Sequence, residues 1–388
     1  MNSYRSIKNL TIFHEKFFVG ASYILLFISA YLLLMYFEEI SFFRYLLLSV
    51  FCISFFTIAL KFFISKLKKR NWFVFFVVIL AIVTQLLNNI YYDVAVFYSN
   101  ALFLIAATIV GYAVTNLDIP KQSFLIVTFF ILFGLMFFIL KYEITHGVGA
   151  ISYLSNKNLL SMIAIPVLLI FFVQYEKNNM YSSNVLMMLV GIGLVVSIMS
   201  TGRSGIITSS IMFIGALIIK ISRSKGKAFI HKLVGFFFMV IVLMTAISIF
   251  FLDYLQTKFS YLYVSGLTDP ARSYIYQHYI ESLTFRQFLS GTNYDEMPEL
   301  VEFGGNLHST YLTYHGNYGI FGIVIFLMFF LSMVKTAWNK DVFMTLVFLS
   351  FSLRIFTDTG NDFFTHVGVF TVIFYGLRKK QIVRRSLN

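Results

Sequence analysis

Residues 123–141 read SFLIVTFFILFGLMFFILK, an almost wholly apolar stretch that ends at a lysine. A helix needs about 20 such residues to cross the hydrocarbon core of a bilayer, so this stretch is typical of a transmembrane helix. The sequence therefore predicts an all-α polytopic membrane protein with about twelve transmembrane helices. The other apolar runs lie at residues 17–37, 43–62, 72–91, 95–115, 158–175, 185–200, 204–220, 232–252, 311–334, 341–356 and 362–377.

The segments that connect these runs alternate in charge. Most of the 30 Lys and Arg residues fall in one set of segments, and most of the 17 Asp and Glu residues fall in the other set. Cationic loops stay in the cytoplasm, which predicts that both termini are cytoplasmic. The basic segments are 1–16, 61–71, 116–122, 175–184, 220–232, 335–341 and 378–388, and the predicted external segments are 38–44, 88–94, 141–157, 200–204, 253–310 and 357–361.

Composition limits the chain to one integral membrane domain, residues 1–388. The chain is 59% hydrophobic and 12% charged, which leaves no stretch for a sizeable water-soluble core. Its net charge of +13 comes from short loops rather than from one face of a soluble domain, so no nucleic-acid partner is expected. The single Cys52 excludes an intrachain disulfide and a cysteine-based metal site.

Polar residues that could carry chemistry collect on the predicted outer side. Few charges fall within the apolar runs, where a charge needs a partner or a cavity. They gather instead at outer helix ends and in the external loop 253–310, which is far longer than ordinary connections. We therefore expect function at the outer face, in three segments.

The first segment is Ser200-Thr201-Gly202-Arg203-Ser204-Gly205, between two apolar runs. Its glycines permit a close turn. The following helix offers free N–H groups and a positive dipole end, so Arg203 could complete a site for an anion. Alternatively, Arg203 only extends to lipid head groups at the end of its helix.

The second segment, residues 269–279, predicts an amphipathic helix of about fourteen residues within the long loop. Asp269 is a good N-cap and Pro270 a good first helical residue, which puts Arg272 in the first turn. Arg272 and Tyr276 share one face one turn apart. Ala271, Tyr274, Ile275, His278 and Ser282 form the face expected to lie on the membrane or over the helix bundle. Alternatively, this helix is a lid whose arginine pairs with a lipid phosphate.

The third segment, residues 304–312, runs into the apolar stretch 311–334. His308 is expected at or just before a helix start, with Tyr311 and His315 below it. Histidine suits proton transfer near neutral pH, although an isolated one is more often an interface hydrogen bonder. Gly316, Gly319 and Gly322 recur every three residues and predict the close approach of a neighbouring helix.

Arg354 lies near the predicted outer end of the run 341–356. It is either a further phosphate contact or the partner of Asp358 four residues later, and the spacing favours the pair.

In combination, these segments resemble the O-antigen ligase and polymerase superfamily of polytopic, lipid-linked glycosyltransferases with a large periplasmic loop. The resemblance covers roughly residues 150–330 and rests on the order of its motifs on one side of the membrane. The motifs are Asn156-Lys157-Asn158-Leu159, Gly202-Arg203-Ser204-Gly205, Ala271-Arg272-Ser273-Tyr274-Ile275-Tyr276, Phe288-Leu289-Ser290-Gly291, Leu307-His308-Ser309-Thr310-Tyr311-Leu312 and Gly319-Ile320-Phe321-Gly322.

The resemblance implies a GT-C-like fold in a bacterial inner membrane and a metal-independent reaction without a cofactor. It implies that Arg203 and Arg272 hold the diphosphate of an undecaprenyl-diphosphate-linked oligosaccharide and that His308 takes part in transfer. Tyr276, Tyr311 and Arg354 are expected as further substrate contacts. The acceptor hydroxyl would be deprotonated by His308 or by an acid such as Glu302 or Asp295.

The expected reaction is polymerisation of repeat units into O-antigen or another surface polysaccharide, with a chain-length regulator as a further expected partner. Ligases typically carry Asn after the histidine, whereas Ser309 stands here, which favours a polymerase over a ligase to lipid A core. The second alternative is a flippase of lipid-linked oligosaccharide. A transporter would hold substrate near the bilayer midplane on broken helices of related halves, whereas the polar residues here lie on one side.

Overall fold

The computed structural model describes residues 2–35, 41–64, 72–89, 94–147, 157–178, 182–200, 202–222, 270–292, 297, 307–358 and 362–378. Every secondary-structure element within these ranges is an α-helix, which confirms the predicted all-α class. The helices are α1 (Asn2–Met35), α2 (Ser41–Ile64), α3 (Trp72–Asn89), α4 (Val94–Asn116), α5 (Lys121–His146), α6 (Lys157–Asn178), α7 (Ser183–Met199), α8 (Arg203–Ser222), α10 (Pro270–Ser282), α11 (Phe285–Ser290), α13 (Thr310–Tyr318), α14 (Ile320–Trp338), α15 (Val342–Phe356) and α16 (Phe363–Leu377).

Several helices are long and apolar enough to cross a membrane. Among the described residues these are Lys16–Met35, Lys121–His146, Asn158–Lys177, Arg203–Lys220 and Ile320–Trp338. Shorter apolar helices accompany them, at Tyr45–Lys61, Ala101–Asn116, Ser183–Met199, Val342–Phe356 and Phe363–Leu377. The predicted span 232–252 lies outside the described residues, so the total of about twelve spans stays a prediction.

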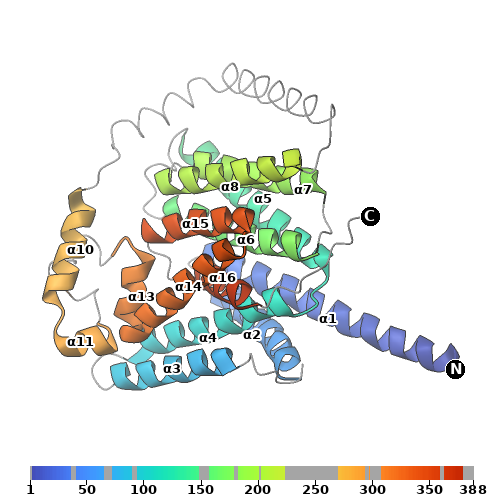
Figure 1. The fold of residues 1–388 in the computed structure, drawn as a ribbon, viewed down its shortest axis with the longest axis horizontal. Coiled ribbons are helices and arrows are strands. Elements are labelled where there is room, and N and C mark those ends of the chain that lie inside the picture. The colour runs from blue at the N-terminus through green and yellow to red at the C-terminus, as the bar shows by residue number, and fades with distance from the viewer. Residues whose placement is uncertain are drawn as a thin grey trace, which may run out of the picture.

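The centre of the bundle is formed by α6 and α16 (Figure 1). α6 packs against α5, α7, α8, α15 and α16, and α16 also packs against α4 and α14. A helix that is apolar on nearly all sides buries its whole circumference, and every side chain of α6 from Leu160 to Tyr175 is buried. On the peripheral helices, large apolar side chains such as Phe56, Phe137 and Leu331 are exposed, as on a surface that faces lipid.

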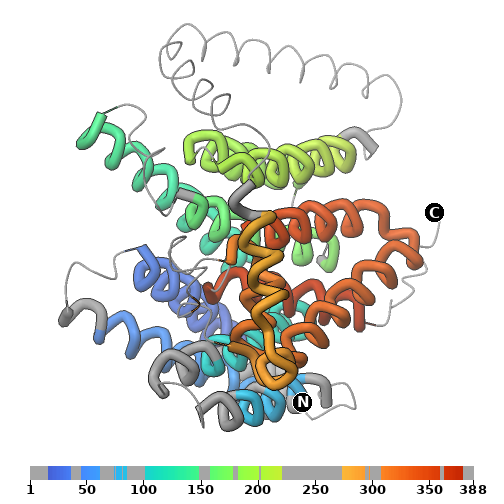
Figure 2. Tube along the Cα trace, turned by 90° about the vertical axis from the view of Figure 1, so that its left-hand side faces the viewer, coloured from blue at the N-terminus to red at the C-terminus, as the bar shows by residue number. Residues whose placement is uncertain are grey.

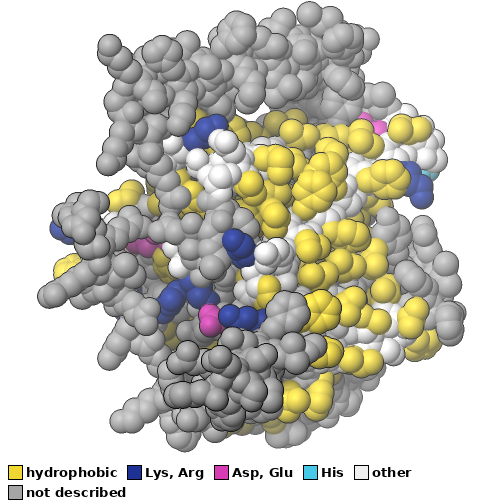
Figure 3. Space-filling model, turned by 90° about the vertical axis from the view of Figure 1, so that its right-hand side faces the viewer, with side chains coloured by type: hydrophobic (Ala, Val, Ile, Leu, Met, Phe, Trp, Pro, Cys, Tyr) yellow, Lys and Arg dark blue, Asp and Glu magenta, His cyan; other side chains and the backbone are white. Residues whose placement is uncertain are grey.

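The bundle has two chemically different ends. At the end that we call the basic end, α2, α6, α8 and α14 terminate with Lys61, Lys177, Lys220 and Lys335 in their last turns. Figure 3 looks onto this side and shows Lys and Arg side chains gathered on it. The opposite end, the loop end, carries α10, α11 and the start of α13 (Figure 2). The charge alternation along the chain is therefore a separation in space, and the cytoplasmic location of the basic end stays a prediction.

The prediction of one continuous span at 311–334 is wrong, because the helix breaks at Gly319 between α13 and α14. Gly319 has a φ of 56°, and the Leu289 carbonyl oxygen of α11 lies 2.2 Å from where a β-carbon would be. Only glycine combines this backbone conformation with so close an approach. The Thr292 N–H also donates to the Gly316 carbonyl at 2.8 Å. Gly316 and Gly319 thus meet the end of α11, which is the close approach of a neighbouring helix that the repeat predicts, whereas Gly322 meets the Tyr314 carbonyl of α13.

α10 begins at Pro270 as predicted, but its buried face differs from the predicted one. Ile275 and Tyr279 are fully buried and pack in one cluster with Leu307. Tyr274, which was expected on the buried face, is 44% exposed. The buried stripe is set by contact with the segment before α13, which lies far away in sequence, and the periodicity of a single helix does not reveal it.

His315 fastens both loop helices to α13. Its Nε2 lies 3.0 Å from the Phe288 carbonyl oxygen of α11, and its Nδ1 lies 2.8 Å from the Tyr279 hydroxyl of α10. Because a carbonyl oxygen only accepts, Nε2 carries the hydrogen and Tyr279 donates to Nδ1. One buried imidazole therefore holds three helices together.

Gly319→Ala is expected to displace α11 from its packing position beside residue 319, where α13 ends and α14 begins. The added methyl group would meet the Leu289 carbonyl in a left-handed backbone, at a combined cost of roughly 2–4 kcal/mol. The expected result is a lower thermal unfolding temperature in detergent and faster proteolysis within residues 270–292. Gly191→Ala is the control, because the atom nearest to its β-carbon is 3.7 Å away. Equal unfolding temperatures for the two variants would contradict the docking of α11.

Candidate functional site

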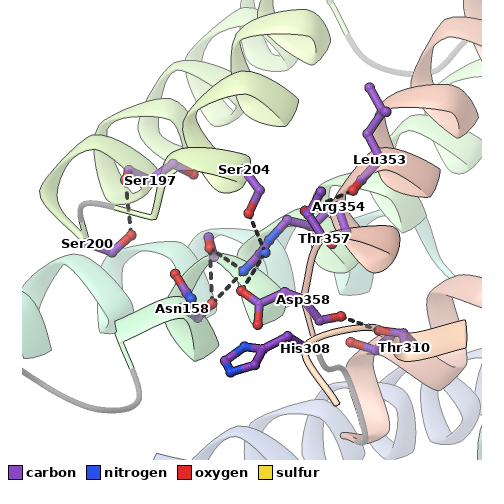
Figure 4. Close-up of polar contacts among 12 residues, drawn as sticks. Asn158, Ser197, Ser200, Ser204, His308, Thr310, Leu353, Arg354, Thr357 and Asp358 are labelled. Carbon is purple, nitrogen blue, oxygen red and sulfur yellow. Dashed lines mark hydrogen bonds and ion pairs between the residues drawn. The ribbon is translucent and has the colours of Figure 1, made fainter. Parts of the chain in front are cut away.

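A fully buried arginine, Arg354 near the end of α15, forms the centre of the candidate site (Figure 4). Its Nη1 donates to Asp358 Oδ2 at 2.8 Å and to Ser204 Oγ at 2.7 Å. Its Nη2 donates to the Asn158 carbonyl oxygen at 2.8 Å and to Ser161 Oγ at 2.9 Å. The guanidinium thus joins α15 to α8 and to the start of α6. The pairing of Arg354 with Asp358, which the spacing favours, is confirmed.

Two glycines allow α8 to approach α6 closely enough for this network. A β-carbon on Gly205 would lie 2.6 Å from Oγ of Ser161, and one on Gly202 would lie 3.1 Å from Oδ1 of Asn158. Larger side chains at these positions would force the two helices apart. α8 begins at Arg203, one residue before the predicted span 204–220, directly beside the first turns of α6.

His308 lies two residues before α13, in agreement with the prediction of a position at or just before a helix start, and has a left-handed φ of 49°. Its carbonyl oxygen accepts a hydrogen bond from the Tyr276 hydroxyl of α10 at 3.0 Å. Two residues later, Thr310 donates to the Asp358 carbonyl oxygen from its N–H at 2.9 Å and from its Oγ1 at 2.8 Å. The start of α13 is thus held between α10 and the end of α15. Figure 4 shows the His308 ring beside Asp358.

One series of hydrogen bonds and short backbone steps joins the three segments that the sequence singles out. The series runs through Ser204, Arg354, Asp358, Thr310, His308 and Tyr276. It begins next to Arg203 and ends one helical turn from Arg272, so the backbones of all three segments gather at the loop end. The Arg272 side chain lies outside the described part of the structure, and its convergence with Arg203 stays a prediction.

Several helix N-termini meet at this site. α6, α8, α13 and α16 all begin at the loop end, and a helix N-terminus carries free N–H groups and a partial positive charge. Asp362 caps α16 by accepting from the Thr365 N–H at 3.0 Å and from its Oγ1 at 2.7 Å. Asp358 is paired with Arg354, whereas Arg203 adds a further cation in the first turn of α8. Since Asp358 and Asp362 are occupied by Arg354 and by α16, the start of α8 with Arg203 is the part of this site suited to an anionic group.

Tyr276 and Tyr311, both predicted substrate contacts, have partners within the protein. The Tyr276 hydroxyl is bonded to the His308 backbone, and the Tyr311 hydroxyl lies 2.9 Å from Ser352 Oγ. The Tyr311 ring also packs against Phe326 of α14. Both tyrosines hold the start of α13 in position, and direct contact of either with substrate stays a prediction.

Sequence reasoning missed several residues that complete the site. Ser161 lies two residues beyond the segment 156–159 that it identified in α6. Asp362 precedes Thr365 by three residues, a spacing typical of an N-cap that could have located the start of α16. His366 is fully buried in α16 and hydrogen bonds through Nδ1 to the Tyr314 hydroxyl of α13. Its only signal in the sequence is a titratable residue within an apolar run.

Comparisons of the chain with protein-family models, with curated proteins and with solved structures find no match.

Arg354→Met is expected to destabilise the protein by about 3–5 kcal/mol, because Asp358 then stays buried without its cation. Adding Asp358→Asn to Arg354→Met removes the unpaired charge and is expected to recover part of this loss. The measurement is thermal unfolding of the purified protein in detergent. Arg286→Met, on an exposed part of α11, is the control for loss of an arginine. A double variant no more stable than Arg354→Met would contradict the importance of the buried pair.

Proposed function

We propose that the protein is a lipid-linked glycan glycosyltransferase of the O-antigen polymerase type. It joins undecaprenyl-diphosphate-linked repeat units into a surface polysaccharide at the outer face of a bacterial inner membrane. The observation that carries this proposal is the series of bonds that connects the Arg203, Arg272 and His308 segments at the loop end. These are the segments in which the chain resembles the superfamily.

The proposal includes an architecture beyond the described helices. The chain forms one GT-C-like membrane domain of about twelve spans, with cytoplasmic termini and the loop 253–310 in the periplasm. The separation of the lysine-rich helix ends from α10, α11 and the start of α13 supports this orientation.

In the proposed reaction, Arg203 and Arg272 grip the diphosphate of the lipid-linked glycan. A guanidinium binds phosphate oxygens in a bidentate manner, and its charge acts strongly where water is excluded. Both arginines occupy the first turn of a helix, where the helix dipole adds to their attraction for an anion. Arg354 does not bind substrate in this proposal. It holds α8, and with it Arg203, in position against α6 and α15.

The proposed bond changes follow from this arrangement. A hydroxyl oxygen of the acceptor glycan forms a bond to the anomeric carbon of the donor, while the bond between that carbon and the diphosphate breaks. The diphosphate leaves with the electron pair and is stabilised by the arginines. His308 accepts the proton of the hydroxyl. Glu302 and Asp295 are the alternative bases, and both lie outside the described residues.

A ligase would use the same site with lipid A core as the acceptor, and Ser309 in place of the ligase Asn is what favours a polymerase. A flippase would hold its substrate at broken helices near the bilayer midplane. The break at Gly319 is explained by the docked backbone of α11, which favours a transferase over a flippase.

Arg203→Ala and Arg272→Ala are each expected to lower polymer formation by about 100-fold, because each removes a charge that stabilises the leaving diphosphate. The measurement is a gel of surface glycan from a deletion strain that carries each variant, with protein level measured alongside. Arg286→Ala is the matched control, because Arg286 is an exposed arginine at the loop end.

The glycan pattern of the variants discriminates between the candidate functions. Lipid A core that carries single repeat units supports a polymerase. Core without any unit, with lipid-linked units accumulating outside, would indicate a ligase, and units retained in the cytoplasm would indicate a flippase. Wild-type ladders from both arginine variants at normal protein level would refute their proposed roles.

His308→Asn is expected to reduce polymer formation by about 100-fold or more without lowering the unfolding temperature. Asparagine tolerates the left-handed backbone of position 308 but cannot accept the proton. His278→Asn on α10 is the control. Normal polymer formation by the His308→Asn variant would show that another residue is the base.

A further inference from the structure

A cavity of about 270 Å³ opens at the basic end, far from the site described above. We call it the basic pocket. α1, α2 and the end of α4 form its walls. Its lining residues are Lys16, Val19, Lys61, Asn116, Leu117 and Asp118. Among the described residues, two ammonium groups from different helices therefore face one cavity together with the carboxylate of Asp118.

A further cation lies directly behind this lining. Lys177 of α6 donates from Nζ to the Leu117 carbonyl oxygen at 2.9 Å, so its ammonium group is next to the wall of the pocket. Like charges brought together repel one another unless a counter-ion joins them. Among the described residues, the ammonium groups of Lys16, Lys61 and Lys177 stand at the pocket with the carboxylate of Asp118, which favours an anionic ligand.

Apolar surface adjoins the cationic groups of the pocket. Phe17 and Phe18, which follow Lys16 in α1, are each 61% exposed, and Leu60, which precedes Lys61 in α2, is 46% exposed. α1 contains a stretch long and apolar enough to cross a membrane. A ligand at this position therefore meets cations at one end and hydrocarbon-like surface at the other.

We propose that the basic pocket binds the phosphate of an anionic phospholipid whose acyl chains lie along α1 and α2. The lysine ammonium groups attract the phosphate, and the exposed rings and leucine contact the chains. Because α1 and α2 both contribute a lysine, the bound head group links these helices to the end of α4. This proposal concerns the end opposite to the glycan site and does not rest on the proposed function.

The first test compares lipids on the wild-type full-length protein in a neutral detergent. Native mass spectrometry and thermal unfolding are measured with phosphatidylglycerol, with phosphatidylcholine and with inorganic phosphate. Phosphatidylglycerol is expected to bind about 10-fold more tightly than phosphatidylcholine and to raise the unfolding temperature. Equal binding of the two lipids would overturn the proposal. Stabilisation by inorganic phosphate without retention of lipid would also overturn it and would assign the pocket to a soluble phosphate compound.

The second test removes the two lysines that line the pocket. The double variant Lys16→Gln and Lys61→Gln is expected to bind phosphatidylglycerol about 30-fold more weakly, since each cation near anionic lipid contributes about a factor of five. The matched control is Lys335→Gln with Lys340→Gln, two exposed lysines of the basic end outside the pocket. Undiminished binding by the first double variant, or an equal loss in the control, would overturn the proposal.

Discussion

The packing of the helices at the loop end depends on one buried guanidinium, that of Arg354. A charge without access to water is tolerated only when oxygen atoms surround it, and Arg354 obtains these from α6, from α8 and from Asp358 just after its own helix. This requirement fixes where the helices end relative to one another. It also explains why glycines stand at 202 and 205, since no side chain fits between α8 and α6 there. The position of Arg203 is a consequence of this packing.

Features that depend on local chemistry could be predicted from the sequence. α10 begins at Pro270, α8 begins within one residue of the predicted position, and His308 lies just before α13, because proline and glycine act within a few residues of themselves. The pairing of Arg354 with Asp358 is also local, since the two residues are one helical turn apart. The alternation of charge is a property of the whole chain, and it predicted that the lysine-rich helix ends would gather at one end of the bundle.

Features that depend on distant contacts could not be predicted. Arg354 reaches across 150 residues to Ser204 and across 196 residues to Asn158, and no pattern in a single sequence shows such a contact. The break at Gly319 depends on the docked end of α11, which an apolar run of normal length conceals. The buried face of α10 likewise depends on Leu307, not on the periodicity of the helix.

The two bonds of His315 have a mechanical consequence. One ring nitrogen holds Tyr279 of α10 and the other holds Phe288 of α11, so reorienting the ring to free one helix also frees the other. Tyr276 attaches α10 to the start of α13 at a second point. α10 and α11 are therefore held to α13 as one unit, and the spacing of the groups that the two helices carry is fixed by the same imidazole.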